Sequence, residues 1–123
     1  MLTHSPLIAF IPTKDTARAR HFYEDLLSLR LLSDDSFAIV IDANGTMVRI
    51  VRVDDFTPFP FTLVGWQVDD IHKTIAEMIS KGVQFLRYPY FEQSEDGVWT
   101  APGGAKVAWF TDPDHNTLSI SQH

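Results

Sequence analysis

The chain has 123 residues, of which 45% are apolar and 12% aromatic, so it has the size of one domain and can bury a continuous core. Its formal net charge of -6 and its ten scattered Lys and Arg residues argue against nucleic-acid binding, because phosphate contacts require clustered basic side chains. Cysteine is absent, which excludes disulfide bonds, thiolate nucleophiles and cysteine-ligated metals. The sequence predicts a single domain over residues 1–123.

The amino-terminal segment MLTHSPLIAF lacks the basic region and the long apolar run of a signal peptide. No stretch approaches the roughly 18 consecutive apolar residues that a membrane-spanning helix needs. We therefore expect a cytoplasmic protein with neither a membrane nor a nucleic acid as its partner.

The first half of the chain predicts a strand, a helix and a hairpin, in that order. Residues 7–11 form a short apolar run typical of a buried strand, which we expect to end at Pro12, where the backbone donor is lost. Asp15 is expected to cap the following helix. The apolar stripe of this helix contains Ala19, Phe22, Tyr23, Leu26 and Leu27. Two strands, 36–43 and 46–53, flank Asn44-Gly45, which favours a tight hairpin because both positions accept positive φ.

Residues 54–61 (DDFTPFPF) predict an extended connector whose three phenylalanines need burial. The pattern then restarts with a strand over 62–68 and a helix that Asp70 caps and Gly82 ends. The apolar face of this helix contains Ile71, Ile75, Met78 and Ile79. Further strands are predicted at 84–88, around Trp99, at 106–111 and at 117–121, with a surface loop over 91–104 and the turn DPDHN over 112–116.

The two halves correspond to each other. Ile8 stands at the same distance before the cap Asp15 as Leu63 stands before the cap Asp70, and strands follow each helix. An internal duplication explains this correspondence most simply. The sequence therefore predicts two repeated units, 1–55 and 62–123.

Three segments carry a family resemblance: TKDTARARHFYEDLLSL, VDDIHKTIAEMISKGVQF and VAWFTDPDHNTLSI. Together with the duplication, they resemble the vicinal oxygen chelate superfamily, the group of glyoxalases, extradiol dioxygenases and bleomycin-resistance proteins. The resemblance implies an α+β fold in which two βαβββ repeats form an open, cupped mixed sheet with helices on the outside. It also implies a homodimer, because such domains commonly complete their clefts by pairing. His115 replaces the glycine usual in the last turn, and His tolerates positive φ there.

Metal-dependent members of this superfamily take His, Glu or Gln ligands from the first and last strand of each unit. The resemblance places these positions at Ile8, Arg49, Leu63 and Ser119. A hydrocarbon has no donor atom, and a guanidinium repels a divalent ion. We therefore expect no metal and no cofactor.

Strand side chains alternate between two faces, which divides the predicted sheets into an apolar face and a mixed face. The apolar face, expected beneath the helices, contains Leu7, Ala9, Ile11, Val48, Ile50, Val64, Trp66, Val68, Leu118 and Ile120. The mixed face contains Ile8, Phe10, Met47, Arg49, Val51, Leu63, Gly65, Gln67, Thr117, Ser119 and Ser121. Apolar walls with a few polar groups are typical of a ligand cavity. The predicted ligand-binding residues are Phe10, Met47, Arg49, Gly65, Gln67, Trp99, Ser119 and Ser121.

The polar residues of this set also have a structural explanation. Arg49 either attracts a carboxylate or phosphate or makes a hydrated or ion-paired subunit contact. Gln67 and the serines either orient polar ligand atoms or satisfy neighbouring strands and loops. Gly65 indicates that backbone or ligand approaches closely at that point.

The remaining polar and aromatic residues are assigned less specific places. The histidines lack ligand spacing and are expected on the surface at His4, His21, His72, His115 and His123. A solvated acidic lip is expected at Glu92, Glu95 and Asp96. Aromatic side chains wall the cavity mouth, or are buried in a dimer or in the core, at Tyr88, Tyr90, Phe91 and Trp99.

Three functions remain open at this point. The first is a small-molecule-binding protein of the glyoxalase/bleomycin-resistance type that lacks the usual metal site. The second is a metal-dependent lyase, isomerase or dioxygenase with atypically placed ligands, since a metal ion can polarise substrate oxygens or bind dioxygen. The third is a protein-interaction module that uses the aromatic connector. The sequence identifies no catalytic residue.

Overall fold

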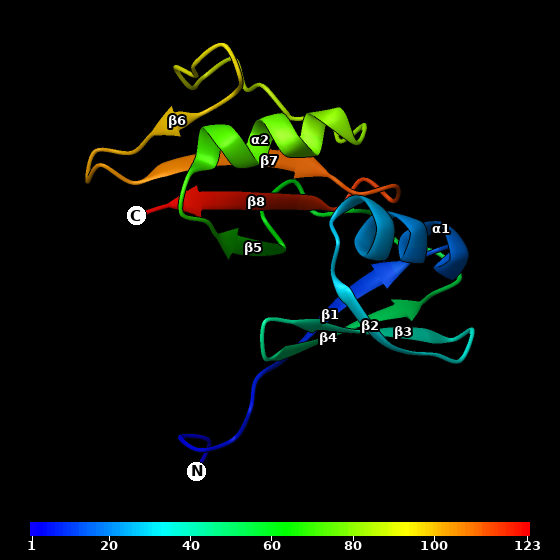
Figure 1. Cartoon of the computed structure of the whole chain (residues 1–123). Coiled ribbons are helices and arrows are strands. Elements are labelled where there is room, and N and C mark those ends of the chain that lie inside the picture. Colours follow the sequence, from blue (N-terminus) through cyan, green and yellow to red (C-terminus); the bar gives the residue numbers. More distant parts are fainter. The chain divides into compact units, whose positions relative to one another are not determined.

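The computed structural model describes all residues from 1 to 123 (Figure 1). The chain divides into two compact units, Met1–Thr57 and Pro58–His123. Each unit consists of a strand, a helical segment and three further strands, which form one four-stranded mixed sheet. The predicted α+β fold of two βαβββ repeats is confirmed. No helix is long and apolar enough to cross a membrane.

Unit 1 pairs its first strand with its last. Its elements are β1 (Ile8–Thr13), α1 (Thr16–Arg20), the π-helical η1 (His21–Leu26), β2 (Arg30–Asp34), β3 (Ala38–Ala43) and β4 (Thr46–Arg52). The sheet order is β1-β4-β3-β2, with β1 parallel to β4 and the other pairs antiparallel. The side chains that face α1 are almost fully buried, as at Ile11, Ile39 and Ile50.

The capped helix of unit 1 is confirmed. The Asp15 carboxylate accepts a hydrogen bond from the backbone N–H of Arg18 at 3.1 Å, as a helix cap does. The helix widens after Arg20, and Leu27 N–H donates to the carbonyl of Phe22, five residues back. Phe22 and Tyr23 are buried, so the predicted stripe faces the sheet.

The first strand does not end at Pro12, as the sequence analysis expected, but continues to Thr13. Because β1 is an edge strand, only one side of it is hydrogen-bonded. Thr13 faces β4, since its carbonyl accepts from Val53 N–H at 2.9 Å. Successive residues alternate, so the missing donor of Pro12 points to the open edge and costs no ladder bond. Leu7, predicted to be buried, lies outside the strand and is exposed.

The predicted hairpin between β3 and β4 is confirmed. Asn44 and Gly45 have φ values of 52° and 97°, the positive angles that a tight two-residue turn requires. Gly45 N–H also donates to the side chain of Asp42 at 2.8 Å. The turn therefore fixes the register in which Val40 lies opposite Arg49.

Unit 2 repeats the topology of unit 1. Its elements are β5 (Val64–Gln67), α2 (Ile71–Ser80), β6 (Trp99–Thr100), β7 (Lys106–Thr111) and β8 (Thr117–Gln122). The sheet order is β5-β8-β7-β6, with β5 parallel to β8. Asp70 caps α2 by accepting from Lys73 N–H, and Gly82 follows it with a φ of 94°. Ile79, predicted on the buried face, is 51% exposed.

Residues 84–88 do not form the predicted strand. Phe85 makes one isolated bridge to Phe110. The side chain of Gln93 occupies the backbone groups that a strand would pair, because it accepts from Tyr88 N–H and donates to the Leu86 carbonyl. Leu86 N–H still donates to the Trp109 carbonyl on β7 at 2.8 Å, so the segment keeps one backbone hydrogen bond to β7 while the Gln93 side chain takes its other groups.

The connector leaves two of its three phenylalanines unburied, against expectation. Phe59 and Phe61 are 59% and 58% exposed and stack on each other at a centroid distance of 5.0 Å. Phe56 lies beneath the Lys14 ammonium, 5.6 Å from the ring centroid. The exposed rings of Phe59 and Phe61 therefore stack on each other and do not enter a core.

Candidate ligand-binding site

The sheet face of unit 1 that points away from α1 carries a free cation among apolar side chains. Phe10 on β1 lies opposite Arg49 on β4, and Ile8 lies opposite Met47. Phe10 is 59% exposed, whereas Arg49 is half-buried and makes no hydrogen bond or ion pair. We call Ile8, Phe10, Met47, Arg49 and Val51 the open face of unit 1. These five residues offer one positive charge and a wide apolar surface, and Asp42 of β3 lies opposite Met47 on the same side of the sheet, 3.9 Å from Arg30.

Asp35 is the acidic group whose carboxylate interacts electrostatically with Arg49. Its carboxylate accepts hydrogen bonds from the backbone N–H groups of Ala38 and Phe37 at 2.8 and 3.0 Å. These two bonds, first that from Ala38, hold the pKa of Asp35 below its ordinary value, and the charge of Arg49 acts in the same direction. Asp35 is thereby committed to the backbone turn before β3, and the Arg49 guanidinium keeps its donors free.

The corresponding face of unit 2 is defined by two rows of residues that lie opposite each other across the strands. One row runs Gly65, Ser119 and Trp109, and the other runs Gln67, Ser121, Val107 and Trp99. The side chains that alternate with them along β8, such as Leu118 and Ile120, are buried on the α2 side. We call the seven residues of the two rows the open face of unit 2. None of them carries a charge.

The Gly65 position is required by its neighbour on β8. A Cβ atom on residue 65 would lie 2.5 Å from Ser119 Oγ, far inside van der Waals contact. The absent side chain therefore lets the Ser119 hydroxyl lie over β5, where it makes no hydrogen bond to the protein. The close approach predicted at Gly65 is thus made by a neighbouring side chain.

Two further polar groups lie beside this hydroxyl. Gln67 is exposed, and its amide makes no hydrogen bond within the chain. Ser121 Oγ lies 3.0 Å from His123 Nε2. Ser119 and Gln67 therefore have hydrogen-bonding capacity left for a ligand, while Ser121 shares its hydroxyl with a histidine.

Aromatic rings stack along one side of the open face of unit 2. We call Tyr88, Tyr90, Phe91, Trp99 and Trp109 the aromatic cluster. Phe91 stacks on Trp99 at 4.6 Å and on Trp109 at 5.3 Å between ring centroids. Burial raises the pKa of the Tyr88 phenol, and the neighbouring Tyr90 adds to the shift. Trp109 was not among the predicted ligand-binding residues, although it shares the face of Ser119.

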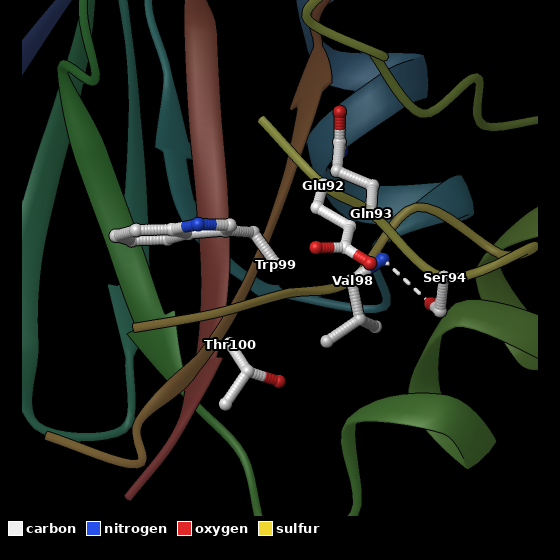
Figure 2. Close-up of a pocket in the computed structure, with 6 residues that line it drawn as sticks. All are labelled: Glu92, Gln93, Ser94, Val98, Trp99 and Thr100. Carbon is white, nitrogen blue, oxygen red and sulfur yellow. Dashed lines mark hydrogen bonds between the residues drawn. The ribbon is translucent and has the colours of Figure 1, made fainter. Parts of the chain in front are cut away.

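A shallow hollow lies beside the cluster, where the segment before β6 folds back on that strand. Its volume is about 450 Å³, and its lining residues are Glu92, Gln93, Ser94, Val98, Trp99 and Thr100. Figure 2 shows the Trp99 indole on one side of this region and Ser94 on the other, with a hydrogen bond from Val98 N–H to Ser94 Oγ. Trp99 is thus the predicted site residue that lines this hollow.

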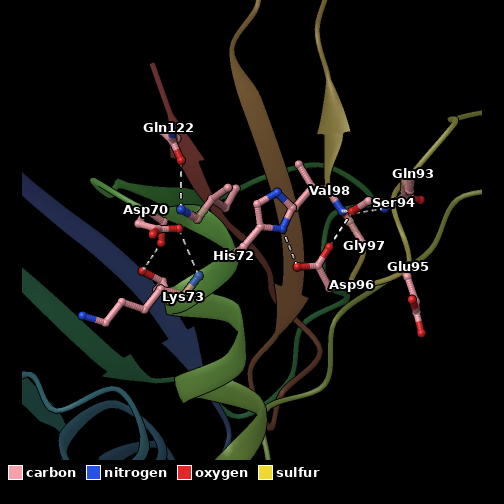
Figure 3. Close-up of polar contacts among 12 residues, drawn as sticks. Asp70, His72, Lys73, Gln93, Ser94, Glu95, Asp96, Gly97, Val98 and Gln122 are labelled. Atoms are coloured by element: carbon pink, nitrogen blue, oxygen red, sulfur yellow. Dashed lines mark hydrogen bonds and ion pairs between the residues drawn. The ribbon is translucent and has the colours of Figure 1, made fainter.

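The histidines and the acidic residues of the loop were also predicted to lie on the surface. All five histidines are exposed, as predicted. Glu92 and Glu95 are exposed as well, but Asp96 does not belong to a freely solvated lip. Its carboxylate contacts His72 on α2 and Ser94 in the same segment, so it forms part of a polar network (Figure 3).

The predicted site residues fall into two groups. Phe10, Met47 and Arg49 come together on unit 1. The second group lies on unit 2 and contains Gly65, Gln67, Trp99, Ser119 and Ser121. Each group is brought together by strand pairing from segments far apart in the sequence.

The positions at which the resemblance places metal ligands do not fit a divalent ion in this chain. Ile8 and Arg49 lie on the open face of unit 1, Leu63 directly precedes β5, and Ser119 lies on β8 of unit 2. Two hydrocarbons, a guanidinium and one hydroxyl provide a single neutral oxygen, whereas such ions take several oxygen or nitrogen donors. No three His, Asp or Glu side chains are grouped to hold an ion elsewhere.

Comparison with known proteins identifies the family. The family model described as Glyoxalase/Bleomycin resistance protein/Dioxygenase superfamily matches residues 6–120. The chain therefore belongs to this superfamily, which confirms the resemblance inferred from its repeats and its final turn. A sequence search of curated proteins finds no match.

Solved structures show the same fold at low sequence identity. A superfamily member from Sphaerobacter thermophilus is 20% identical with a TM-score of 0.78, and the match covers 100% of both chains. A bleomycin resistance determinant encoded on the transposon Tn5 is 18% identical with a TM-score of 0.75, covering 97% of this chain and 98% of the other. A lactoylglutathione lyase from Agrobacterium tumefaciens is 14% identical with a TM-score of 0.73, covering 99% and 96%.

Proposed function

We propose that this chain is a small-molecule-binding protein of its superfamily that holds its ligand without a metal ion at the superfamily's ligand positions. The observation that carries the proposal is the donor set at Ile8, Arg49, Leu63 and Ser119, which suits ligand contact better than metal coordination. The open faces combine apolar walls with a few unpaired polar groups, as small-molecule sites do.

Arg49 is the residue proposed to bind an anionic group of the ligand. It is the one charged residue among those that define the two open faces, and its guanidinium makes no hydrogen bond or ion pair, although its charge acts on Asp35. A planar guanidinium matches the geometry of a carboxylate or phosphate with two parallel hydrogen bonds. Phe10 and Met47 flank it with exposed apolar surface, which suits the hydrocarbon part of such a ligand.

The open face of unit 2 is proposed, by itself, to bind uncharged groups of a ligand. Ser119 and Gln67 present free hydrogen-bonding groups, and Trp109 and Trp99 present aromatic surface on the same face. Gly65 contributes by leaving room for the Ser119 hydroxyl. A ligand with a ring and a polar edge would use both kinds of group.

Isothermal titration calorimetry tests this function with a panel of benzoate, phenyl phosphate and benzyl alcohol. Arg49→Ala is expected to weaken binding of the two anions about tenfold or more, since a charge-assisted hydrogen bond is lost. Arg52→Ala is the matched control, because Arg52 is an exposed arginine on the same strand outside the open face. Equal anion binding by wild type and Arg49→Ala would remove Arg49 from the role.

We also propose that the protein is a homodimer. Ile8, Phe10 and Met47 are 44%, 59% and 36% exposed, and they lie on β4 and on β1, whose outer edge is unpaired. Neighbouring apolar side chains and an open strand edge are the surfaces that subunit contacts cover. Light scattering at micromolar concentration is expected to give twice the chain mass, and a monomer at all concentrations would contradict the proposal.

A further inference from the structure

A close polar contact joins helix α2 to the segment that carries part of the aromatic cluster. His72 Nδ1 lies 2.6 Å from Asp96 Oδ2, although the two residues are 24 positions apart. Figure 3 shows the imidazole reaching from α2 toward the carboxylate. Both side chains are partly exposed, at 51% and 31%. The contact therefore connects helix α2 to the segment before β6.

Ser94 connects the Asp96 carboxylate to the backbone just before β6. Its hydroxyl donates to Asp96 Oδ1 at 2.5 Å and accepts from Val98 N–H at 2.9 Å. Ser94 N–H also donates to the Val98 carbonyl at 2.8 Å. Trp99 directly follows Val98. The position of the Asp96 carboxylate therefore affects the position of the Trp99 backbone, from which the indole extends.

Two other side chains maintain the internal shape of the same segment. The Arg87 guanidinium donates to the carbonyls of Gln93, Ser94 and Glu95 at 2.9 to 3.2 Å. The Gln93 amide donates to the carbonyl of Gly97 at 2.7 Å. These bonds stay within residues 86–98, so they shape the segment without attaching it to α2. The His72–Asp96 contact supplies that attachment.

We propose that His72 and Asp96 are positioning residues that hold segment 93–98 against α2 and thereby set the orientation of Phe91 and Trp99 beside the open face of unit 2. Phe91 lies just before this segment and Trp99 just after it, and their rings stack at 4.6 Å. The inference rests on the proposed function, because it assigns the cluster to ligand binding. It adds that ligand affinity depends on a contact that does not touch the ligand.

The His72–Asp96 contact lies among several charged groups. These are Asp70 and Lys73 on α2, Arg87 and Glu95 beside or within the segment, and Lys106 on β7. Partial burial raises the pKa of Asp96, but hydrogen bonds from Ser94 and His72 outweigh it and leave the pKa below its ordinary value. The Asp96 carboxylate is therefore ionised at neutral pH, and its two oxygens accept hydrogen bonds from Ser94 and His72.

Near-ultraviolet circular dichroism of the unliganded protein tests the positioning role. His72→Ala and Asp96→Asn are expected to reduce the tryptophan signal at pH 7, because each removes one partner of the contact. His72→Asn retains a hydrogen-bond donor, so it is expected to restore part of the signal. His21→Ala is the matched control, because His21 makes a similar pair with Asp25 at 2.9 Å on the helix of unit 1.

The ligand measurement separates this inference from the proposed function. Affinity for benzyl alcohol is expected to fall about three- to tenfold in His72→Ala and to stay unchanged in His21→Ala, because ordering an interface side chain has a cost of that size. A tryptophan signal in His72→Ala equal to that of wild type would overturn the positioning role, whatever the ligand result. No binding of the panel by wild type would instead contradict the proposed function, since the spectra are recorded without ligand.

Discussion

The Ser119 hydroxyl occupies the space that a side chain on Gly65 would fill, with 2.5 Å between Oγ and the position of such a Cβ. Gly65→Ala is therefore expected to force Ser119 into another rotamer at a cost of about 1 kcal/mol. Alanine also lowers the entropy of the unfolded chain, which offsets part of that cost. Urea unfolding should show little net change or a modest loss of stability.

The double variant Gly65→Ala with Ser119→Ala isolates the clash. Without the hydroxyl, the new methyl group has room, so this variant is expected to be more stable than Ser119→Ala alone by up to about 1 kcal/mol. Additive effects of the two substitutions would show that the close approach has no energetic weight.

The buried carboxylate of Asp112 organises the turn between β7 and β8. It is 4% exposed and accepts hydrogen bonds from Asp114 N–H, Asn116 N–H and Asn116 Nδ2, at 2.9 to 3.0 Å. Asp112→Ala leaves these donors without a charged acceptor and is expected to destabilise the fold by about 2–4 kcal/mol in urea unfolding. His115→Asn serves as the control, because His115 is exposed in the same turn and Asn tolerates its φ of 66°.

Asp35 predicts an acid-dependent loss of stability in unit 1. Its pKa lies below the ordinary value of 3.8, chiefly because of the hydrogen bond from Ala38 N–H. A depressed pKa means that the folded state binds the proton less readily than the unfolded state does. The stabilisation is therefore present above the unfolded-state pKa and lost as pH falls through the folded one. Asp35→Ala should flatten the stability profile below about pH 4. An unchanged stability profile in Asp35→Ala would show that Asp35 does not cause this loss of stability.

Trp109 is expected to matter for ligands that contain a ring. Trp109→Ala removes the surface that stacks on Phe91 and should weaken binding of benzyl alcohol by about 1 kcal/mol. Trp109→Phe keeps a ring but loses the hydrogen bond from the indole N–H to Thr62 Oγ1 at 3.1 Å, so it should retain most of the affinity. Calorimetry that gives equal values for all three proteins would exclude a contact with Trp109.

Local signals in the sequence predicted the parts of the fold that depend on neighbouring residues. The caps Asp15 and Asp70 and the Asn44-Gly45 turn are where they were expected, because each depends on one side chain or one backbone angle. The open faces followed from period-two alternation, and applying the same rule to β7 would have included Trp109.

Parts of the fold that depend on distant partners could not be predicted in this way. Strand β2 (Arg30–Asp34) has polar and mostly exposed residues because it is a sheet edge with a bulge, so it lacks an apolar pattern. Residues 84–88 have such a pattern, but the Gln93 side chain takes their backbone groups. The His72–Asp96 contact joins positions that no sequence spacing relates.

Metal analysis of protein purified without a tag tests the central claim most directly. The donors at Ile8, Arg49, Leu63 and Ser119 predict no stoichiometric Fe, Mn, Ni or Zn, and anion binding that is unchanged by a chelator. One equivalent of such an ion per chain, together with ligand binding that the chelator abolishes, would contradict the account and support a metal-dependent lyase, isomerase or dioxygenase instead.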